Sequence, residues 1–370
     1  MNDSLITQPT LLLNESICRA NMQRMAQKAH QHNLQFKPHM KTHQSAEIGE
    51  WLRDYGTEAI TVSSVSMASY FAGHGWHDIT IAFPCNLRET ESINTLAGNI
   101  SLTLLVNGLS TGRTLQKRLA HPVEVYIELD TGSGRTGLRP SEVTAIISLV
   151  DYLTDEETTM LQWKGFYSHP GHSYNARSNK EVRSVHQSVL NKISRLRNEL
   201  GSAYGAYEVC IGDTPCCSTG TDFSGIDAIS PGNFVFYDLM QARIGSCTVS
   251  DIATAVACPV VDWYADRNQL AIYGGAIHFS KESLTENGTT HFGQAAVTKG
   301  KEQAWSVSDP ETYLARLSQE HGIVQCSPQT FEQFSIGDLI TILPVHSCLT
   351  AHLLGRFQLV GSGVRIEQFG

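Results

Sequence analysis

The 370-residue sequence has no long apolar run, no run of basic residues and no regular cysteine spacing. No segment approaches the roughly 18 consecutive apolar residues that a membrane-spanning helix needs. The net charge is −9 and lysines and arginines are scattered, which argues against a nucleic-acid partner. The opening stretch, MNDSLITQPT, lacks the basic start and apolar core of a secretory signal. We therefore expect a cytoplasmic protein with no membrane partner.

The cysteines do not form a disulfide framework. There are nine of them, an odd number, and no CxxC motif occurs. In a reducing compartment, most such cysteines act as small buried apolar residues. The content of 41% hydrophobic and 17% charged residues is that of an ordinary globular protein with a sizeable core.

The first two thirds of the chain alternate between strand-like and helix-like segments. Eight short strands are predicted, most of them separated by a helix. They lie near residues 34–41, 58–64, 77–83, 101–106, 123–130, 161–169, 207–213 and 226–231. Eight such units predict an α/β fold, a (β/α)8 or TIM barrel, over residues 14–241.

The pattern changes after Asp238. From there on, segments such as TAVACPVVDWY and DLITILPVH read as strands with turn signals between them. This predicts an all-β domain over residues 242–370. Residues 1–13 are extended and apolar, and we expect them to pair with that β domain.

The segment LQFKPHMKTHQ places Lys41 between His39 and His43, just behind Pro38. On a strand these three side chains would share one face, and they are poor material for a core. Lys41 would lie at the carboxyl end of the first barrel strand, where barrel enzymes build their active sites. The alternative is a solvated lysine at an exposed strand end.

Two glycine-containing segments, GDTP and SPGN, follow the seventh and eighth strands, the usual place for a phosphate site in a barrel. Gly212 and Gly232 allow a close approach of backbone N–H groups to an anion, and Thr214 and Asn233 can donate side-chain hydrogen bonds. Either segment alone is more often a plain turn. Together with Lys41 they predict pyridoxal 5′-phosphate, with the lysine amine bonded to its aldehyde carbon.

The segment LPVHSCL places His346 and Cys348 two residues apart. On an extended strand, both would point to the same side. An imidazole and a thiolate together favour a divalent metal, with zinc the best match, and two protein ligands leave positions for water or substrate. The alternative is a buried cysteine beside a histidine with another partner.

Taken together, these segments resemble the D-serine dehydratase and D-threonine aldolase family, the alanine-racemase-like enzymes of fold type III. PHMKTH resembles the family's PHxKTH stretch, which carries the cofactor lysine. The segments ELDTGSGRTG, GDTP, SPGNFVFYD, QEHG and GDLITILPVHSCLT resemble its other signatures. The resemblance covers essentially the whole chain and implies a barrel followed by a β domain.

The resemblance also implies roles for individual residues. Lys41 would bind the cofactor, Arg135 would face its phenolic oxygen and Tyr174 would lie near its pyridine nitrogen. An uncharged partner at that nitrogen would make the ring a weaker electron sink. Thr214, Gly232 and Asn233 would hold the phosphate, and His346 and Cys348 would bind the metal.

The activity expected from the resemblance is dehydration of a D-3-hydroxy amino acid, a small-molecule substrate, by a homodimer. HPGHSY, GDTPCC and Cys348 are closer to the dehydratases than to the aldolases, which show His-x-Asp. An aldolase stays the main alternative, and a racemase or a non-catalytic cofactor carrier is less favoured. An aldolase would need a base for the β-hydroxyl, which could be His39, His43, His169 or His172. The substrate carboxylate could meet Arg243, Tyr237 or Tyr167.

Overall fold

The computed structural model describes residues 6–300 and 303–369. They divide into two compact units, which are described separately. The barrel unit consists of Arg24–Lys41 and Leu52–Gly232, and the β unit consists of Met1–Gln23, Thr42–Trp51 and Asn233–Gly370. Two helices, α1 (Glu15–Gln31) and α2 (Ala46–Arg53), carry residues of both units. The domain boundaries predicted from the sequence, 14–241 and 242–370, remain our proposal.

The barrel unit contains an eight-stranded parallel sheet, in the order β2-β9-β8-β7-β6-β5-β4-β3. An isolated parallel bridge between His39 and Thr61 joins its two edges, so the barrel is nearly closed. The predicted barrel is therefore confirmed. Its strands are β2 (Gln35–Phe36), β3 (Ala59–Val62), β4 (Asp78–Pro84), β5 (Ser101–Leu105), β6 (Val123–Glu128), β7 (Leu161–Ser168), β8 (Glu208–Ile211) and β9 (Ala228–Ile229).

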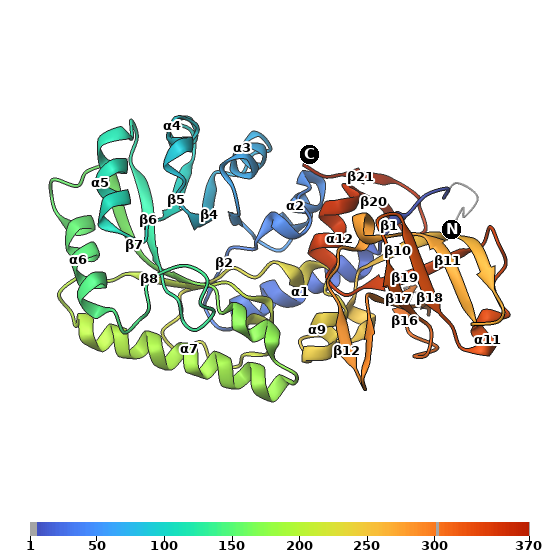
Figure 1. The fold of residues 1–370 in the computed structure, drawn as a ribbon. Coiled ribbons are helices and arrows are strands. Elements are labelled where there is room, and N and C mark those ends of the chain that lie inside the picture. Colours follow the sequence, from blue (N-terminus) through green and yellow to red (C-terminus); the bar gives the residue numbers. More distant parts are fainter. Residues whose placement is uncertain (1–5, 301–302, 370) are drawn as a thin grey trace. The chain divides into compact units, whose positions relative to one another are not determined.

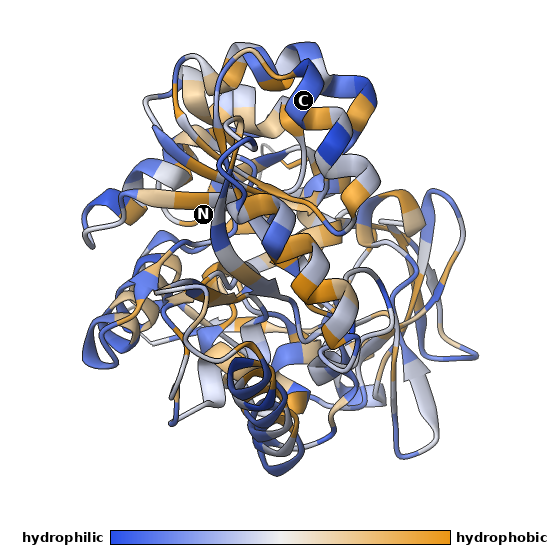
Figure 2. Ribbon diagram, turned by 90° about the vertical axis from the view of Figure 1, so that its left-hand side faces the viewer, coloured by the Kyte–Doolittle hydropathy of each residue, from blue (hydrophilic) through white to orange (hydrophobic). Residues whose placement is uncertain are grey.

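Helices cover the outside of this sheet (Figure 1). The longest, α7, begins after Ser178, whose side chain accepts a hydrogen bond from the N–H of Glu181 as an N-cap. Its buried residues recur every three or four positions, whereas the rest of its surface is hydrophilic (Figure 2). The helices are α3 (Val65–Gly73), α4 (Thr90–Ala97), α5 (Leu109–Arg118), α6 (Val143–Thr154), α7 (Asn179–Leu200) and the short α8 (Thr214–Thr219).

The β unit contains a closed antiparallel barrel. Its strands pair in the ring β10-β19-β14-β17-β18-β11, and β11 pairs again with β10. The predicted C-terminal β architecture is confirmed. The ring consists of β10 (Thr254–Tyr264), β11 (Gln269–Tyr273), β14 (Gly293–Ala295), β17 (Tyr313–Leu317), β18 (His321–Gln325) and β19 (Leu339–Pro344).

Three more strands extend this sheet from β10. The first, β1 (Thr10–Leu13), pairs antiparallel with β10 and parallel with β20 (Arg356–Leu359), which pairs with β21 (Arg365–Glu367). Two small hairpins join β12 (Leu284–Glu286) to β13 (Thr289–His291) and β15 (Val297–Lys299) to β16 (Ala304–Ser306). The helices of this unit are α9 (Leu239–Ile244), α10 (Ala276–Phe279), α11 (Pro328–Phe331) and α12 (Ser347–Leu354).

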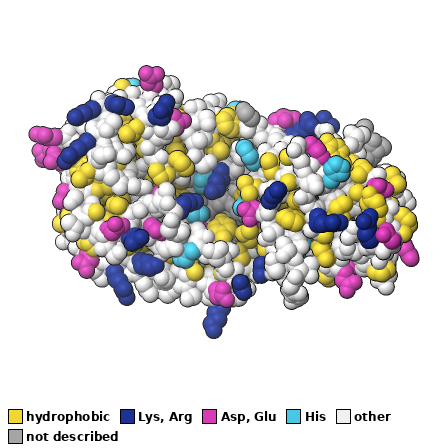
Figure 3. All heavy atoms as spheres, in the orientation of Figure 1, with side chains coloured by type: hydrophobic (Ala, Val, Ile, Leu, Met, Phe, Trp, Pro, Cys, Tyr) yellow, Lys and Arg dark blue, Asp and Glu magenta, His cyan; other side chains and the backbone are white. Residues whose placement is uncertain are grey.

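Charged side chains of both signs are interspersed on the face of the molecule shown in Figure 3. None of the described helices is both long and apolar enough to cross a membrane.

Candidate functional site

Lys41 lies on a tight turn at the carboxyl end of β2. The strand ends at Phe36, and Met40–Thr42 form a 3-10 helix, so the predicted strand through His39, Lys41 and His43 is wrong. The ring Nδ1 of His39 accepts a hydrogen bond from the N–H of Lys41 at 3.3 Å. Strand-like pairing continues to His39, which bridges to Thr61 and donates its N–H to Pro231, and the chain turns after it.

His43 repeats this local pattern in the β unit. Its Nδ1 accepts a hydrogen bond from the N–H of Ser45 at 3.1 Å. Burial lowers the pKa of His43 to about 3, so the ring is neutral at physiological pH. In this arrangement the two-residue spacing of the histidines stabilises the backbone of a turn.

His169 follows β7 and is a neutral imidazole on the carboxyl rim of the barrel. Burial, together with the positive charges of Lys41 and Arg135, lowers the pKa of His169 to about 3. Its Nδ1 is hydrogen-bonded to the carbonyl oxygen of Gly212, so Nδ1 carries the proton and Nε2 is an acceptor. The charge effects also place Lys41 and Arg135 in the neighbourhood of this ring.

The loop after β7 is fastened to the loop after β8 by three successive contacts. His169 meets the carbonyl of Gly212, the Ser173 hydroxyl donates to Asp213 Oδ2 at 2.6 Å, and the N–H of Thr214 points at the Tyr174 hydroxyl at 3.4 Å. The loop that carries Tyr174 and the GDTP segment are therefore held together by these contacts.

Gly212 is required by close packing at this rim. A Cβ atom at this position would collide with the hydroxyl of Tyr167 and would lie 3.0 Å from the carbonyl oxygen of Ser230. The side chain of Tyr167 is buried. Only glycine lets the chain after β8 pass so close to that after β9.

Asp213 is the central residue of this fastening. Its Oδ2 also accepts a hydrogen bond from the N–H of Cys216 at 2.9 Å and caps α8, and the side chain is buried. Sequence reasoning assigned Asp213 no role, although a carboxylate before Thr-Pro is a recognisable N-cap signal.

We expect Asp213→Ala to lower the free energy of unfolding by about 2 kcal/mol, because it removes a cap and leaves Ser173 without its acceptor. Urea unfolding measures the loss. The matched control is Asp222→Ala, which removes an exposed turn carboxylate bonded to Ser224 and should cost no more than about 0.5 kcal/mol. Equal losses of unfolding free energy in the two variants would show that the contacts between the loops after β7 and β8 do not stabilise the rim.

Arg135 lies on the loop after β6, with about half of its side chain exposed. Its guanidinium lies 3.9 Å from the buried carboxylate of Glu128. The same loop is shaped by Asp130, whose Oδ1 accepts hydrogen bonds from the N–H groups of Gly132 and Gly134, both at 3.0 Å. These bonds outweigh the effect of burial and lower the pKa of Asp130.

Gly232 and Thr214 are both buried at the ends of their strands. The N–H of Gly232 donates no hydrogen bond to any described residue. A buried backbone donor without a protein acceptor suits an anionic ligand such as a phosphate.

His346 and Cys348, the predicted metal ligands and hereafter the metal pair, lie in the β unit, at the start of α12. His346 is the N-cap residue of the helix and Cys348 lies in its first turn, so the predicted strand at this pair is wrong. Burial disfavours the charged form of both side chains. The attraction between the protonated imidazole and the thiolate outweighs this effect of burial. The pKa of His346 is raised to about 9 and that of Cys348 is lowered. The two groups are thus close enough to interact.

Polar groups surround the sulfur of Cys348. The Thr42 hydroxyl lies 3.4 Å from Sγ, and Asn233 Nδ2 also lies 3.4 Å from it. Asn233 Nδ2 further donates to Asp238 Oδ2 at 2.7 Å, and the same carboxylate oxygen accepts from the N–H of Ser347 at 3.0 Å. The Asn233 side chain therefore lies with the metal pair, although the sequence suggested it for a phosphate.

Asp238, Thr42 and Ser347 have no predicted role. Asp238 is buried, and its Oδ1 caps α9 by accepting from the N–H of Gln241 at 2.9 Å. The sequence signal for this cap is an aspartate directly before a helical pattern. Its contact with Ser347 joins residues 109 positions apart, for which no local pattern exists.

The donor set suits a zinc-type ion. A thiolate and an imidazole are preferred zinc ligands, and a metal would take the place of the proton they share. In the described part of the chain, no three or more His, Cys, Asp or Glu side chains are grouped to hold a metal. The protein would thus supply two ligands.

The three other residues considered for a substrate carboxylate are held differently. Arg243 forms an ion pair with Glu286 at 3.8 Å. Tyr237 is buried, with a φ of 47°. Tyr167 is buried, and its hydroxyl packs closely against Gly212.

Comparison with known proteins agrees with this architecture. Residues 14–239 match the family model for the alanine racemase N-terminal domain, and residues 253–360 match the model for a putative serine dehydratase domain. The chain is similar to the D-serine dehydratase of Dictyostelium discoideum, with 28% identity over 99% of this chain and 96% of the relative.

Two solved structures extend the comparison. D-threo-3-hydroxyaspartate dehydratase from Delftia sp. HT23 superposes with a TM-score of 0.89 and 22% identity, covering 99% of this chain and 98% of the other. D-threonine aldolase from Filomicrobium marinum superposes with a TM-score of 0.82 and 20% identity, covering 100% of this chain and 94% of the other. Structures of the Delftia enzyme include a cysteine-to-alanine mutant described as metal-free and a histidine-to-alanine mutant, two positions apart.

A parallel (β/α)8 barrel followed by an antiparallel β barrel, with a lysine at the carboxyl rim, is the architecture of the fold-type III pyridoxal-phosphate enzymes. The chain belongs to the alanine racemase-like family of these enzymes and carries the serine dehydratase domain.

Proposed function

We propose that the protein is a pyridoxal-phosphate- and metal-dependent lyase that eliminates water from a D-3-hydroxy amino acid. The substrate would be D-serine or a β-substituted relative, and the products a 2-keto acid and ammonia. This goes beyond its membership in a family of D-amino acid lyases.

One observation carries the proposal. Thr42, the residue that follows Lys41 in the chain, lies 3.4 Å from the sulfur of Cys348, which is itself in contact with His346. Lys41, suited to the cofactor, is thus the chain neighbour of a residue whose hydroxyl contacts Cys348, one of the two residues suited to a metal. Elimination of hydroxide needs both groups, because hydroxide is a poor leaving group.

The residues of the barrel rim fit the cofactor. Lys41 and Arg135 provide positive charge, and the buried N–H of Gly232 is an unused donor for a phosphate. Tyr174 would offer its uncharged hydroxyl to the ring nitrogen, with Gly212 and Thr214 beside the phosphate. When bound, the cofactor supplies an electron sink for the pair of electrons left at Cα.

Lys41 has a second task in this reaction. Its Nζ takes the proton from the substrate's Cα, on the D face. The neutral ring of His169 places no additional positive charge beside this amine.

His346 and Cys348 would hold the metal, with Asp238, Thr42 and Asn233 orienting them. Such outer partners fix the geometry of ligands. The metal would supply the Lewis acidity that helps the β-hydroxyl leave. The two-residue spacing of the substituted histidine and cysteine in the Delftia enzyme, one variant of which is metal-free, supports this assignment.

The principal alternative is an aldolase that cleaves Cα–Cβ and releases glycine and an aldehyde. It would use the same cofactor and metal and a base at the β-hydroxyl. The Nδ1 atoms of His39 and His43 accept N–H bonds, so in the neutral rings Nε2 carries the proton and cannot act as the base. His169 keeps Nε2 as an acceptor and is the better candidate. A homodimer in the cytoplasm also belongs to the proposal.

The decisive experiment incubates the protein, loaded with pyridoxal phosphate and zinc, with D-serine, D-threonine and D-threo-3-hydroxyaspartate. Keto acid, ammonia and glycine are followed together. We expect keto acid and ammonia in equal amounts. Glycine with an aldehyde would move the protein to the aldolases, and full cofactor loading without any product would make it a carrier.

A further inference from the structure

We propose that Lys37 is a positioning residue, which fixes the turn that carries Lys41 by anchoring it to a buried charged cluster inside the barrel. Lys37 lies four positions before Lys41. The inference rests on the proposed function, in which Lys41 binds the cofactor.

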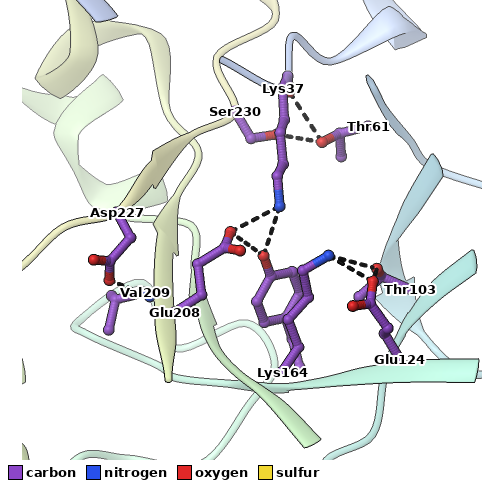
Figure 4. Close-up of polar contacts among 10 residues, drawn as sticks. Lys37, Thr61, Thr103, Glu124, Lys164, Glu208, Val209, Asp227 and Ser230 are labelled. Atoms are coloured by element: carbon purple, nitrogen blue, oxygen red, sulfur yellow. Dashed lines mark hydrogen bonds and ion pairs between the residues drawn. The ribbon is translucent and has the colours of Figure 1, made fainter. Parts of the chain in front are cut away.

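The side chain of Lys37 is held inside the barrel. It is fully buried, and its Nζ donates to the Tyr126 hydroxyl at 2.9 Å and to Glu208 Oε1 at 2.7 Å. Tyr126 in turn donates to the same carboxylate oxygen. Figure 4 shows the amine of Lys37 pointing at Glu208. A buried ammonium away from its partners is very unfavourable, so this side chain has one strongly preferred position.

The backbone of Lys37 is held as firmly. Its N–H donates to the carbonyl of Ile229 at 2.9 Å, and its carbonyl accepts from the Thr61 hydroxyl at 3.0 Å. The Ser230 hydroxyl donates to Thr61 at 2.7 Å, so this chain of bonds reaches the strand that precedes Gly232 (Figure 4). Lys37 therefore couples the barrel interior to the two edges of the sheet.

A short, stiff segment joins this anchor to Lys41. Pro38 fixes one backbone dihedral, the N–H of His39 donates to the carbonyl of Pro231 at 2.8 Å, and the N–H of Lys41 bonds back to the His39 ring. A shift of Lys37 would thus displace Lys41. Misplacing a reacting group by about 1 Å can cost about 100-fold in rate.

The barrel contains its own control for this idea. Lys164 Nζ lies 2.6 Å from Glu124 Oε2, and this second ion pair belongs to β7 and β6 (Figure 4). Lys164 and Lys37 lie at similar distances from the ring of Tyr126, 5.7 and 5.4 Å. Removing either pair perturbs the same cluster, but only the Lys37 pair is tied to the turn of Lys41.

The test compares the full-length double variants Lys37→Met/Glu208→Gln and Lys164→Met/Glu124→Gln, each of which removes one ion pair. Pyridoxal phosphate is titrated into both, its affinity is read from visible absorbance, and its bonding to Lys41 is trapped with borohydride and located by peptide mass. We expect the Lys37 pair to weaken cofactor binding and slow trapping by about tenfold or more. The Lys164 pair should change both by less than about twofold.

Equal effects of the two double variants would overturn the positioning role and leave a structural one. If the wild-type protein bonds the cofactor at Lys41 and the Lys37 pair behaves like its control, only this inference fails. If the wild-type protein does not bond it at Lys41, the proposed function fails with it.

A milder pair keeps the comparison possible if a double variant does not fold. Thr61→Val removes the donor to the Lys37 carbonyl, and Thr80→Val changes its buried register partner on β4, whose hydroxyl has no partner among the described residues. Slower trapping in Thr61→Val alone supports the anchor, and equal trapping overturns it.

Discussion

Lys41→Ala is expected to abolish covalent attachment of pyridoxal phosphate and to reduce turnover by about 10³-fold or more. The substitution removes both the amine that bonds to the cofactor and the base for the substrate's Cα proton. The visible absorbance of the cofactor-loaded protein and the rate of keto acid formation measure the two losses separately.

Lys117→Ala is the matched control, because Lys117 is an exposed lysine in the last turn of α5. It should leave absorbance and rate unchanged. Retention of the absorbance band in Lys41→Ala would mean that another lysine bonds to the cofactor, and the assignment of Lys41 would be wrong.

Cys348→Ala is expected to retain the cofactor but to slow dehydration by about 100-fold or more, because one of two protein ligands to the metal is lost. A strong chelator should reproduce the loss in the wild-type protein, and added zinc should reverse it. Metal content by mass spectrometry should fall in parallel with the rate.

Cys247→Ala provides the comparison, since Cys247 is also a partly buried cysteine of the β unit that forms no disulfide. Its metal content and rate should be those of the wild type. Dehydration that survives complete removal of metal would exclude a metal role for His346 and Cys348.

The architecture could be predicted from the sequence because it depends on repeated local patterns. Buried strand segments alternate with helical ones through Ile229, and the short strands after Asp238 are punctuated by turn residues. The first pattern predicts the barrel, and the second predicts the β unit. The pairing of β10 with β11 is a hairpin across residues 265–268. The pairings of β19 with β10 and with β14 join strands that lie far apart in the chain, and no local pattern indicates them.

The two histidine-containing motifs show where local reading fails. A two-residue spacing predicts a shared face only on a strand, but His39 and Lys41 lie on a turn and His346 and Cys348 at a helix start. In the second motif each side chain still shifts the pKa of the other, so the two interact without sharing the face of a strand. Spacing identified the residues without identifying the geometry.

The environment of Cys348 could not be predicted at all. Asn233 reads as part of a glycine-containing turn, and its choice of partner depends on Asp238 and Ser347 being brought together by packing. Amide side chains bond to several kinds of partner, so their role is decided by tertiary structure.

The strand β1 has a consequence for synthesis of the chain. Thr10 pairs with Ala257, and Leu12 pairs with Gln358. At about 5–20 residues per second, a ribosome makes these partners on the order of tens of seconds after β1. During that time Leu11, Leu12 and Leu13, all buried in the finished protein, have no sheet to join. The nascent chain thus carries this apolar segment without its sheet partner until β10 has been made, and over that interval the segment is open to aggregation.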